Sequence, residues 1–397
     1  MDTAVVNKAL ELFPTPVYLF DEGEVHARIQ HLREGLPPHV QLCYAMKANS
    51  FILRQAACDA DRIEACSPGE LRTCFALGIP DSKIVVSGVH KDEAFMKELV
   101  DEHPAIARFT VESVAQFNLL ECCAQSAGRQ IPLLLRLSSG NQFGMDAAIL
   151  EGLVMRCKDN PAVEFCGIQY FSGTQKTSAK RIGRELAYLD TFIAEIERNC
   201  NVAVAELEYG AGLPVLYFDP EQEAAEQQDE LMATVSSLLD GMSFSGELSI
   251  ELGRSIAASC GTYATRIVDV KCNAGENYAI VDGGKHHITY YGNALAMKQP
   301  PCRTIPERTT GAHESWNMCG SLCTVNDILV KQMDLCDPRI GDVLVFERCG
   351  AYCMTEGISL FLSRDLPRIV LRDIAGNLEL VRERFETYSL NTPASSR

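Results

Sequence analysis

The stretch Gln41-Leu42-Cys43-Tyr44-Ala45-Met46-Lys47-Ala48-Asn49-Ser50 is a short apolar run that carries one lysine near its end. Its strand-compatible residues predict a buried β-strand whose last residues emerge at the edge of a sheet. Lys47 therefore lies where burial gives out. Since a desolvated ammonium is costly, such a lysine extends towards water, pairs with an acid, or supplies a neutral amine for covalent chemistry. This strand alone leaves all three interpretations open.

After this strand, short apolar or β-rich segments alternate with segments of helical periodicity. The alternation is typical of strand–helix units in a parallel sheet, and eight such strands close a (β/α)8 barrel. We therefore predict an α/β fold with a TIM-like barrel over residues 22–250. Besides the Lys47 strand, the predicted barrel strands are 62–65, 84–87, 108–111, 133–137, 164–170, 206–209 and 247–251.

Beyond Arg254, strand-like segments follow one another with Gly, Pro and Asn turns between them and little helical periodicity. This predicts a mainly antiparallel β domain over residues 251–385, which residues 1–21 are expected to join. We expect residues 386–397 to be a frayed tail and the run 220–230 to be a solvated loop and helix face. The expected strands of the β domain are 262–272, 278–281, 288–290, 328–333, 342–346, 359–362 and 368–372.

Composition limits the possible partners and the compartment. A formal net charge of -17 over 397 residues disfavours binding to nucleic acid or to an anionic membrane surface. The sequence near Met1 does not resemble a secretory signal, and no apolar run approaches the roughly 18 residues of a membrane span. The 17 cysteines then indicate reduced thiols, so we expect a cytoplasmic protein.

Two cysteine pairs have spacings that a zinc site could use: Cys319 with Cys323, and Cys349 with Cys353. Each pair is embedded among glycines and apolar residues that the motifs below explain better. We therefore predict no metal.

Several polar residues follow predicted barrel strands, where the catalytic groups of such barrels gather. Glu64 ends one strand, and Glu251 ends another with Arg254 three residues on. Gly210 and Gly212 would let backbone N–H groups approach an anion. Taken singly, these signals indicate turns and surface ion pairs as readily as a site. Together with Lys47 they are what a phosphorylated aldehyde cofactor needs: an amine, a phosphate site and an acid facing a ring nitrogen.

With these motifs, the chain resembles the fold type III pyridoxal 5′-phosphate decarboxylases, which include diaminopimelate, ornithine and arginine decarboxylases. The resemblance covers about residues 15–375. It rests on motifs in the same order along the chain: Thr15-Pro16-Val17-Tyr18, Tyr44 to Asn49, Glu64 to Leu71, Gly173-Thr174-Gln175, Gly210-Ala211-Gly212, Glu251-Leu252-Gly253-Arg254, Asp282-Gly283-Gly284, Cys319 to Cys323 and Gly350-Ala351-Tyr352.

The resemblance implies a role for each matching residue. Lys47 would bind the cofactor covalently, and Glu251 would keep its pyridine nitrogen protonated. Cys323 would reprotonate the α-carbon of the substrate from the partner subunit, so that a homodimer shares its active sites. The other implied cofactor contacts are Glu64 and Phe171, with Gly210, Ala211, Gly212, Thr174 and Tyr352 at the phosphate and Arg254 at the phosphate or the substrate carboxylate.

Four positions depart from the family pattern. Phe171 stands where a histidine usually stacks on the cofactor, Ala211 replaces a glycine, and Glu64 replaces a more frequent aspartate. Thr324 stands where ornithine- and diaminopimelate-type enzymes have an acid that pairs with a distal ammonium of the substrate, a charge that threonine cannot supply. The resulting Cys-Thr-x-x-Asp loop, Cys323 to Asp327, looks more like members of siderophore or antibiotic pathways, whose substrates carry the far end of the amino acid as an amide.

The sequence therefore favours a pyridoxal phosphate-dependent decarboxylase acting on an amino acid or an amino acid conjugate, free or held on a carrier protein, whose distal amine is absent or acylated. The first alternative is a diaminopimelate- or ornithine-type decarboxylase of a free diamino acid. A second is a catalytically silent homologue that binds a partner protein, and a third is an amino acid racemase of the same barrel class.

Overall fold

The computed structural model describes residues 1–393 and contains two compact units. One comprises His26–Val215 and Gln222–Ile256; the other comprises Met1–Val25, Leu216–Glu221 and the chain from Ala257 onward. Compared with the expected limits at 21/22 and 250/251, these divisions fall slightly later in the chain. Glu251 and Arg254 consequently belong to the first unit, which we call the barrel unit; the second is the β unit.

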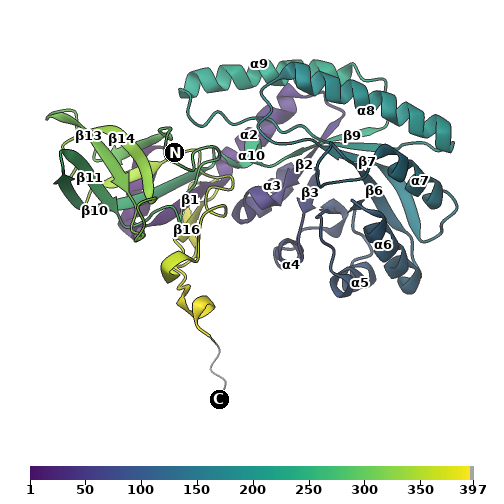
Figure 1. Ribbon diagram of the computed structural model, residues 1–397, viewed down its shortest axis with the longest axis horizontal. Helices are drawn as coiled ribbons and strands as arrows, with labels where there is room; N and C mark the ends of the chain where they lie inside the picture. Colours follow the sequence, from purple (N-terminus) through teal and green to yellow (C-terminus); the bar gives the residue numbers. More distant parts are fainter. Residues whose placement is uncertain (394–397) are drawn as a thin grey trace. The chain divides into compact units, whose positions relative to one another are not determined.

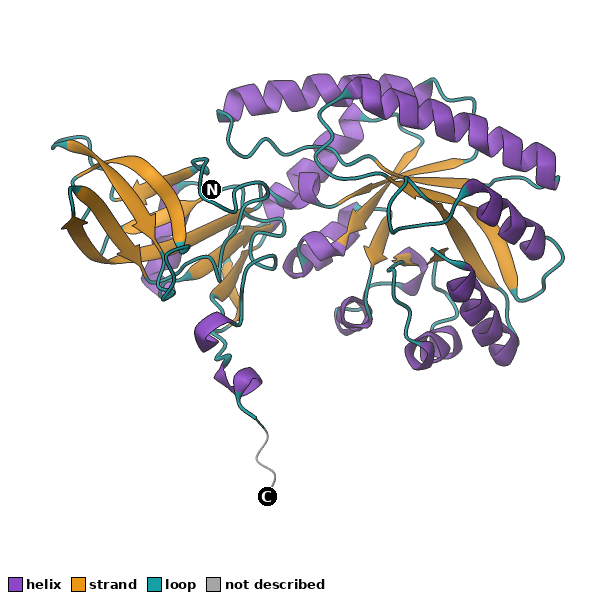
Figure 2. Ribbon diagram, viewed as in Figure 1, coloured by secondary structure: helices purple, strands orange, loops and turns teal. Residues whose placement is uncertain are grey.

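Eight parallel strands close a barrel in the first unit, which confirms the predicted fold class. Each strand is a short, almost fully buried run, and helices lie outside the ring of strands (Figures 1 and 2). The strands are β2 (Val40–Ala45), β3 (Arg62–Ala65), β4 (Ile84–Val86), β5 (Arg108–Val111), β6 (Ile131–Leu137), β7 (Val163–Phe171), β8 (Glu206–Gly210) and β9 (Glu247–Leu252).

The barrel helices begin soon after the strands, several of them at a side-chain cap. The Ser67 hydroxyl accepts a hydrogen bond from the backbone N–H of Glu70, and Asp92, Ser113 and Ser178 cap three further helices in the same way. These caps fix where each strand-to-helix turn ends. The helices are α2 (Glu22–Gly35), α3 (Leu53–Asp59), α4 (Pro68–Ala76), α5 (Glu93–Glu102), α6 (Val114–Ala127), α7 (Ala147–Cys157), α8 (Ala179–Cys200), α9 (Glu221–Asp240) and the single turn α10 (Arg254–Ala257).

The β unit is organised around β1 (Val17–Asp21), which lies between β10 (Gly261–Asn273) and β16 (Arg368–Arg372). Its sheet has nine strands and is mostly antiparallel, with parallel pairing between β1 and β16 and between β11 and β13. Helix α1 (Thr3–Leu12) packs Val6 and Ala9 onto it. The other strands are β11 (Glu276–Val281), β12 (Cys302–Ile305), β13 (His313–Cys319), β14 (Ile328–Cys336), β15 (Val343–Phe346) and β17 (Leu378–Arg382).

Two predicted strands of the β unit are wrong. Residues 288–290 form no strand: the N–H of Ile288 closes a turn onto the carbonyl of Gly284, and the N–H of Thr289 donates to the carbonyl of Cys353 in a loop. Residues 359–362 are not extended either: a short 3₁₀ turn begins at Phe361, and Leu362 has a φ of 59°.

The predicted solvated run 220–230 is the first half of helix α9, whose buried face begins at Ala224. The tail expected to fray from residue 386 makes specific contacts: Thr387 is buried and donates a hydrogen bond to the carbonyl of Arg364, and a 3₁₀ turn spans Tyr388–Asn391. Residues 394–397 lie outside the described residues.

Within residues 1–393, no helix is long and apolar enough to cross a membrane. The same residues contain no group of three or more His, Cys, Asp or Glu side chains arranged to hold a metal ion.

Closure between β7 and β8 depends on Gly167. A Cβ atom at this position would lie 1.9 Å from the carbonyl oxygen of Glu206 on β8. We predict that Gly167→Ala lowers the free energy of unfolding by more than about 4 kcal/mol, because neither backbone can withdraw without breaking the ladder. Gly152 in α7 is the control, since a Cβ there meets no atom within 4 Å and Gly152→Ala should raise stability by about 0.5–1 kcal/mol. Equal effects of the two substitutions in urea unfolding would refute this role of Gly167.

Candidate active site

Lys47 lies in a 3₁₀ turn (Met46–Ala48) directly after β2, at the carboxyl end of the barrel. Its ammonium contacts two carboxylates: Glu64 at the end of β3, and Glu251 on β9, whose Oε1 is 3.1 Å from Nζ. The strand register explains the meeting, because Ala45 pairs with Glu64 and Cys43 pairs with Glu251. The Lys47 side chain is 37% exposed, whereas those of Glu64 and Glu251 are 4% and 7% exposed. Of the three interpretations of Lys47 (extension towards water, pairing with an acid, or supply of an amine for covalent chemistry), the structure shows pairing. The partial exposure of its side chain also leaves covalent chemistry open.

The two carboxyl groups differ in pKa although both are buried. At Glu64, burial opposes ionisation, but the charge of Lys47 and the contact with it outweigh burial and lower the pKa to about 2. At Glu251, burial and the negative charge of Glu64 prevail over Lys47 and raise the pKa to about 7. Glu64 therefore holds the negative charge beside Lys47, and Glu251 can exchange a proton near neutral pH.

Charges inside the barrel form two layers. In the lower layer, nearer the amino ends of the strands, Arg62 contacts Glu206 and Glu247, and Arg108 Nε donates to Glu206 Oε2 at 2.7 Å. Two guanidinium groups thus face two carboxylates. Glu64 and Glu208 lie two residues further along β3 and β8, and with Glu251 of β9 they form the upper layer, in which Lys47 contacts Glu64 and Glu251. This upper layer has more carboxyl groups than cations.

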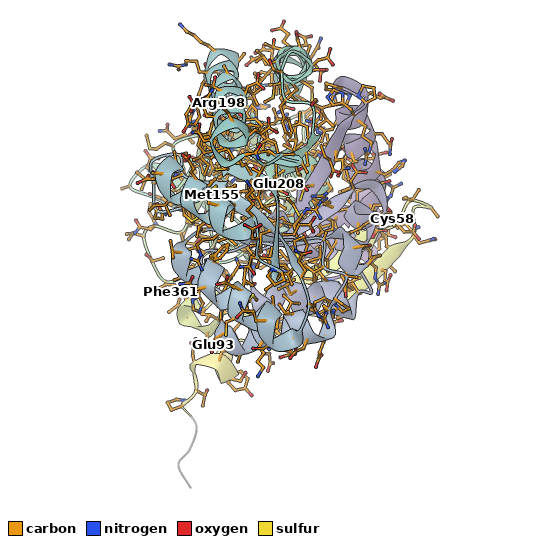
Figure 3. All side chains as sticks on the ribbon, turned by 90° about the vertical axis from the view of Figure 1, so that its right-hand side faces the viewer. Cys58, Glu93, Met155, Arg198, Glu208 and Phe361 are labelled. Carbon is orange, nitrogen blue, oxygen red and sulfur yellow. The ribbon has the colours of Figure 1, made fainter. Side chains whose placement is uncertain are left out.

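Glu208 of β8 belongs to this layer and was not among the predicted site residues. Figure 3 shows it inside the barrel unit, whereas Met155 and Arg198 lie on outer helices. It is 0% exposed, and neither carboxyl oxygen has a hydrogen-bonding partner among residues 1–393. Burial, and next the charges of Glu251 and Glu64, raise its pKa well above the usual range. The ionised form of Glu208 is therefore disfavoured.

Gln169 of β7 is a second residue that the sequence analysis missed. Its Nε2 donates to Glu251 Oε2 at 3.4 Å, so Glu251 is held between Lys47 and an amide. Only the register of β7, β8 and β9 brings Gln169 to this point, with Gln169 paired to Glu208 and Glu208 paired to Ser249.

The predicted phosphate loop, Gly210-Ala211-Gly212, leaves β8 and lies against the loop that leaves β7. A Cβ atom at Gly210 would lie 2.2 Å from the Phe171 ring, and one at Gly212, where φ is 59°, would lie 2.3 Å from the carbonyl oxygen of Gly173. Both glycines are therefore required by close approach of the two loops. Ala211 is buried, which its small side chain allows.

Gln175 fastens these two loops together. Its Nε2 donates to the carbonyl of Val215 at 2.9 Å, and its Oε1 accepts from the N–H of Val215 at 2.7 Å. The N–H of Lys176 also donates to the carbonyl of Gly212 at 2.9 Å. Thr174 is exposed between these contacts, and Arg254 is buried at the start of α10, just after Glu251.

Three predicted site residues belong to the β unit. Cys323 is exposed and Thr324 half-buried, in the loop between β13 and β14; Tyr352 has a φ of 64° in the loop after β15. Cys323 is therefore not a buried thiol within its own chain.

Asp327 holds the Cys323 loop in place. Its carboxylate accepts hydrogen bonds from the N–H of Leu322 at 2.7 Å and of Lys285 at 2.8 Å, and it is only 3% exposed. Cβ atoms at Gly284 and Gly320 would lie 2.7 Å and 2.2 Å from Asp327 Oδ2. The Asp282-Gly283-Gly284 motif and the Cys-Thr-x-x-Asp loop therefore pack against each other through Asp327.

The residues of the barrel unit suit a phosphorylated pyridine aldehyde. Lys47 offers a partly exposed amine. Gly210 and Gly212 carry no side chain that would keep a phosphate away from the backbone N–H groups of their loop. The surplus of carboxyl groups in the upper layer would be offset by a protonated ring nitrogen. The donor set therefore fits pyridoxal phosphate.

Comparison with known proteins agrees with this geometry. Residues 17–350 match a family model described as "Pyridoxal-dependent decarboxylase, C-terminal sheet domain". The match includes Lys47, Glu251 and Cys323 and covers most of the chain.

Three curated relatives match over nearly their whole length. The L-glutamyl-[BtrI acyl-carrier protein] decarboxylase of Niallia circulans is 26% identical, covering 97% of this chain and 94% of the relative. The diaminopimelate decarboxylase of Vibrio cholerae is 30% identical, covering 95% and 92%. The 2-[(L-alanin-3-ylcarbamoyl)methyl]-2-hydroxybutanedioate decarboxylase of Staphylococcus aureus is 24% identical, covering 90% and 94%.

The protonation of Glu208 can be tested by the pH dependence of stability. A carboxyl whose pKa is raised by folding binds its proton more tightly in the native state, so stability falls as pH rises above the unfolded value of about 4.3. Glu208→Gln removes this effect. We predict that the cofactor-free variant matches the wild type near pH 5 and becomes more stable than it by up to about 1.4 kcal/mol per pH unit above that.

Urea unfolding between pH 5 and pH 9 measures this difference. Glu164→Gln is the control, because Glu164 is an exposed carboxyl on β7. If the stability difference between Glu208→Gln and the wild type does not change with pH, Glu208 is not protonated in the native state.

Proposed function

This chain belongs to the family of pyridoxal-dependent decarboxylases, and from that membership we propose that it removes carbon dioxide from the α-carbon of an amino acid or amino acid conjugate whose distal amine is absent or acylated, in a biosynthetic pathway. The observation that carries the substrate class is Thr324, which follows Cys323 where an acid would be needed to pair with a distal ammonium. The enzyme class and the cofactor, pyridoxal 5′-phosphate, follow from the family.

We propose that the cofactor binds in the barrel unit along the residues described above. Lys47 would carry it covalently, Glu251 would lie at the ring nitrogen, and Phe171 would contact the ring face. Glu64 would balance charge beside Lys47. The phosphate would bind the Gly210-Ala211-Gly212 loop with Thr174, Arg254 and Tyr352, of which Arg254 also suits a substrate carboxylate.

When bound, pyridoxal phosphate supplies an electron sink for the charge left at the α-carbon as carbon dioxide departs. The protein then controls protons. Glu251, with a pKa raised to about 7 and an amide partner in Gln169, can hold a proton where the ring nitrogen would lie. Cys323 would deliver a proton to the α-carbon; its exposure within its own chain supports a role at the active site of a partner subunit, as in a homodimer.

Two relatives support a substrate whose distal amine is absent or acylated. The name of the Niallia circulans enzyme describes a glutamyl group on an acyl-carrier protein, and that of the Staphylococcus aureus enzyme describes an amino acid joined through a carbamoyl group to a hydroxybutanedioate. In both names the far end of the amino acid lacks a free ammonium. The alternative, decarboxylation of a free diamino acid, has its support in the Vibrio cholerae relative.

We also propose a reducing, cytoplasmic location. Its support is that none of the 17 cysteines, all of which lie within residues 1–393, forms a disulfide.

Lys91 is another lysine at the carboxyl end of the barrel, so the covalent attachment of the cofactor to Lys47 can be tested against attachment to Lys91. Lys91 is 8% exposed, burial lowers its pKa to about 8, and its ammonium donates to the carbonyls of Ser87 and Gly88. We predict that borohydride reduction of the holoenzyme attaches the cofactor to the peptide that contains Lys47. Mass spectrometry of the digest measures this, and Lys47→Ala should abolish labelling and activity. Label at Lys91, or full turnover by Lys47→Ala, would refute the assignment.

The substrate class can be tested with Thr324→Glu, which adds the missing acid. We predict that the wild type releases carbon dioxide from carrier-bound or citryl amino acid conjugates at least about tenfold faster, as kcat/KM, than from free diamino acids, and that Thr324→Glu narrows this preference. Val325→Glu is the matched control, because the neighbouring side chain is 90% exposed and the variant carries the same added charge. A wild type that prefers diaminopimelate or ornithine would support the alternative.

A further inference from the structure

A buried ion pair lies behind the Gly210-Ala211-Gly212 loop, and none of the roles assigned above uses it. The Lys176 side chain is 0% exposed, and its ammonium lies 2.8 Å from Glu185 Oε2 of α8. Burial lowers the pKa of Lys176, opposed by the contact with Glu185. Removing two charges from water costs free energy that the attraction between them offsets only with good geometry and further hydrogen bonds. Stability alone therefore does not explain an ion pair at this loop.

Glu185 is itself held by three further groups. Ser172 Oγ donates to Oε1 at 2.6 Å, Arg181 Nε donates to the same oxygen at 3.0 Å, and the Tyr209 hydroxyl donates to Oε2 at 2.8 Å. The Lys176 ammonium also lies 4.8 Å from the centre of the Tyr209 ring. The position of the ammonium is therefore fixed from several sides.

Lys176 binds two carbonyl oxygens of the loop. Its Nζ donates to the carbonyl of Gly210 at 3.0 Å, and its backbone N–H donates to the carbonyl of Gly212 at 2.9 Å. In a planar trans peptide, a carbonyl and the N–H of the next residue point in opposite directions. Binding these two oxygens therefore turns the N–H groups of Ala211 and Leu213 to the other side of the loop.

We propose that Lys176 is a positioning residue for the phosphate of the cofactor. By holding the carbonyls of Gly210 and Gly212 on its own side, it keeps two oxygen dipoles that would repel a phosphate turned away and presents the intervening N–H groups instead. This orientation of the loop would make the chain bind the phosphorylated cofactor much more tightly than the same aldehyde without phosphate. This inference rests on the proposed cofactor site.

The test compares affinities for pyridoxal phosphate and pyridoxal, because a general loss of stability would weaken both alike. Equilibrium dialysis of the full chain gives the ratio of the two dissociation constants. We expect Lys176→Met to reduce the preference for the phosphorylated form at least about tenfold while pyridoxal binding changes little. Lys176→Gln, whose amide can still donate to the Gly210 carbonyl, should restore part of the preference.

Lys83 provides a matched control, since its ammonium also binds two carbonyls, those of Ala57 and Ala60 at 2.7 and 2.9 Å. Lys83→Met should lower the temperature of unfolding without altering the ratio of affinities. An unchanged ratio in Lys176→Met, an equal change in Lys83→Met, or failure of both Lys176 variants to fold would each overturn the proposal. A wild type that binds neither compound would instead refute the cofactor site itself.

Discussion

The contact of one ammonium, Lys47, with two buried carboxylates, Glu64 and Glu251, is the interaction on which the site depends. Closing eight parallel strands brings these residues together, because Lys47 directly follows β2, Glu64 lies on β3 and Glu251 lies on β9. Because one cation faces several acids in a low-dielectric interior, their protonation states must separate. The charge of Lys47 lowers the pKa of Glu64 to about 2, whereas burial raises the pKa of Glu251 to about 7 and that of Glu208 well above its usual range.

The surrounding structure supports this arrangement at two levels. Below it, Arg62 and Arg108 face Glu206 and Glu247, so the carboxyl groups that outnumber their cations lie nearer the carboxyl end of the barrel. Beside it, the loops after β7 and β8 approach so closely that only glycine fits at Gly210 and Gly212. A buried carboxyl group at Glu251, next to a loop whose two glycines carry no side chain, suits a ligand that has a ring nitrogen and a phosphate.

Much of this could be predicted from the sequence where the signal is local. The barrel strands are short apolar runs that end in polar residues, so their order and the meeting of Lys47, Glu64 and Glu251 were predictable. Strands β12, β13 and β17 were missed because few of their residues are fully buried, so their sequences carry little of the apolar signal of a core strand. Helix α9 was predicted only in part, as a solvated loop and helix face over residues 220–230, because its acidic first half has few apolar residues. Glu208, Gln169 and Lys176 were not identified, since their roles depend on register and contacts between segments distant in the chain.

A crystal structure of the chain grown with pyridoxal 5′-phosphate tests the central claim most directly. The prediction is density continuous from Lys47 Nζ into the cofactor, with the ring nitrogen at Glu251 and the phosphate at the Gly210–Gly212 loop. Density joined to a different lysine, or a phosphate bound away from that loop, would contradict it.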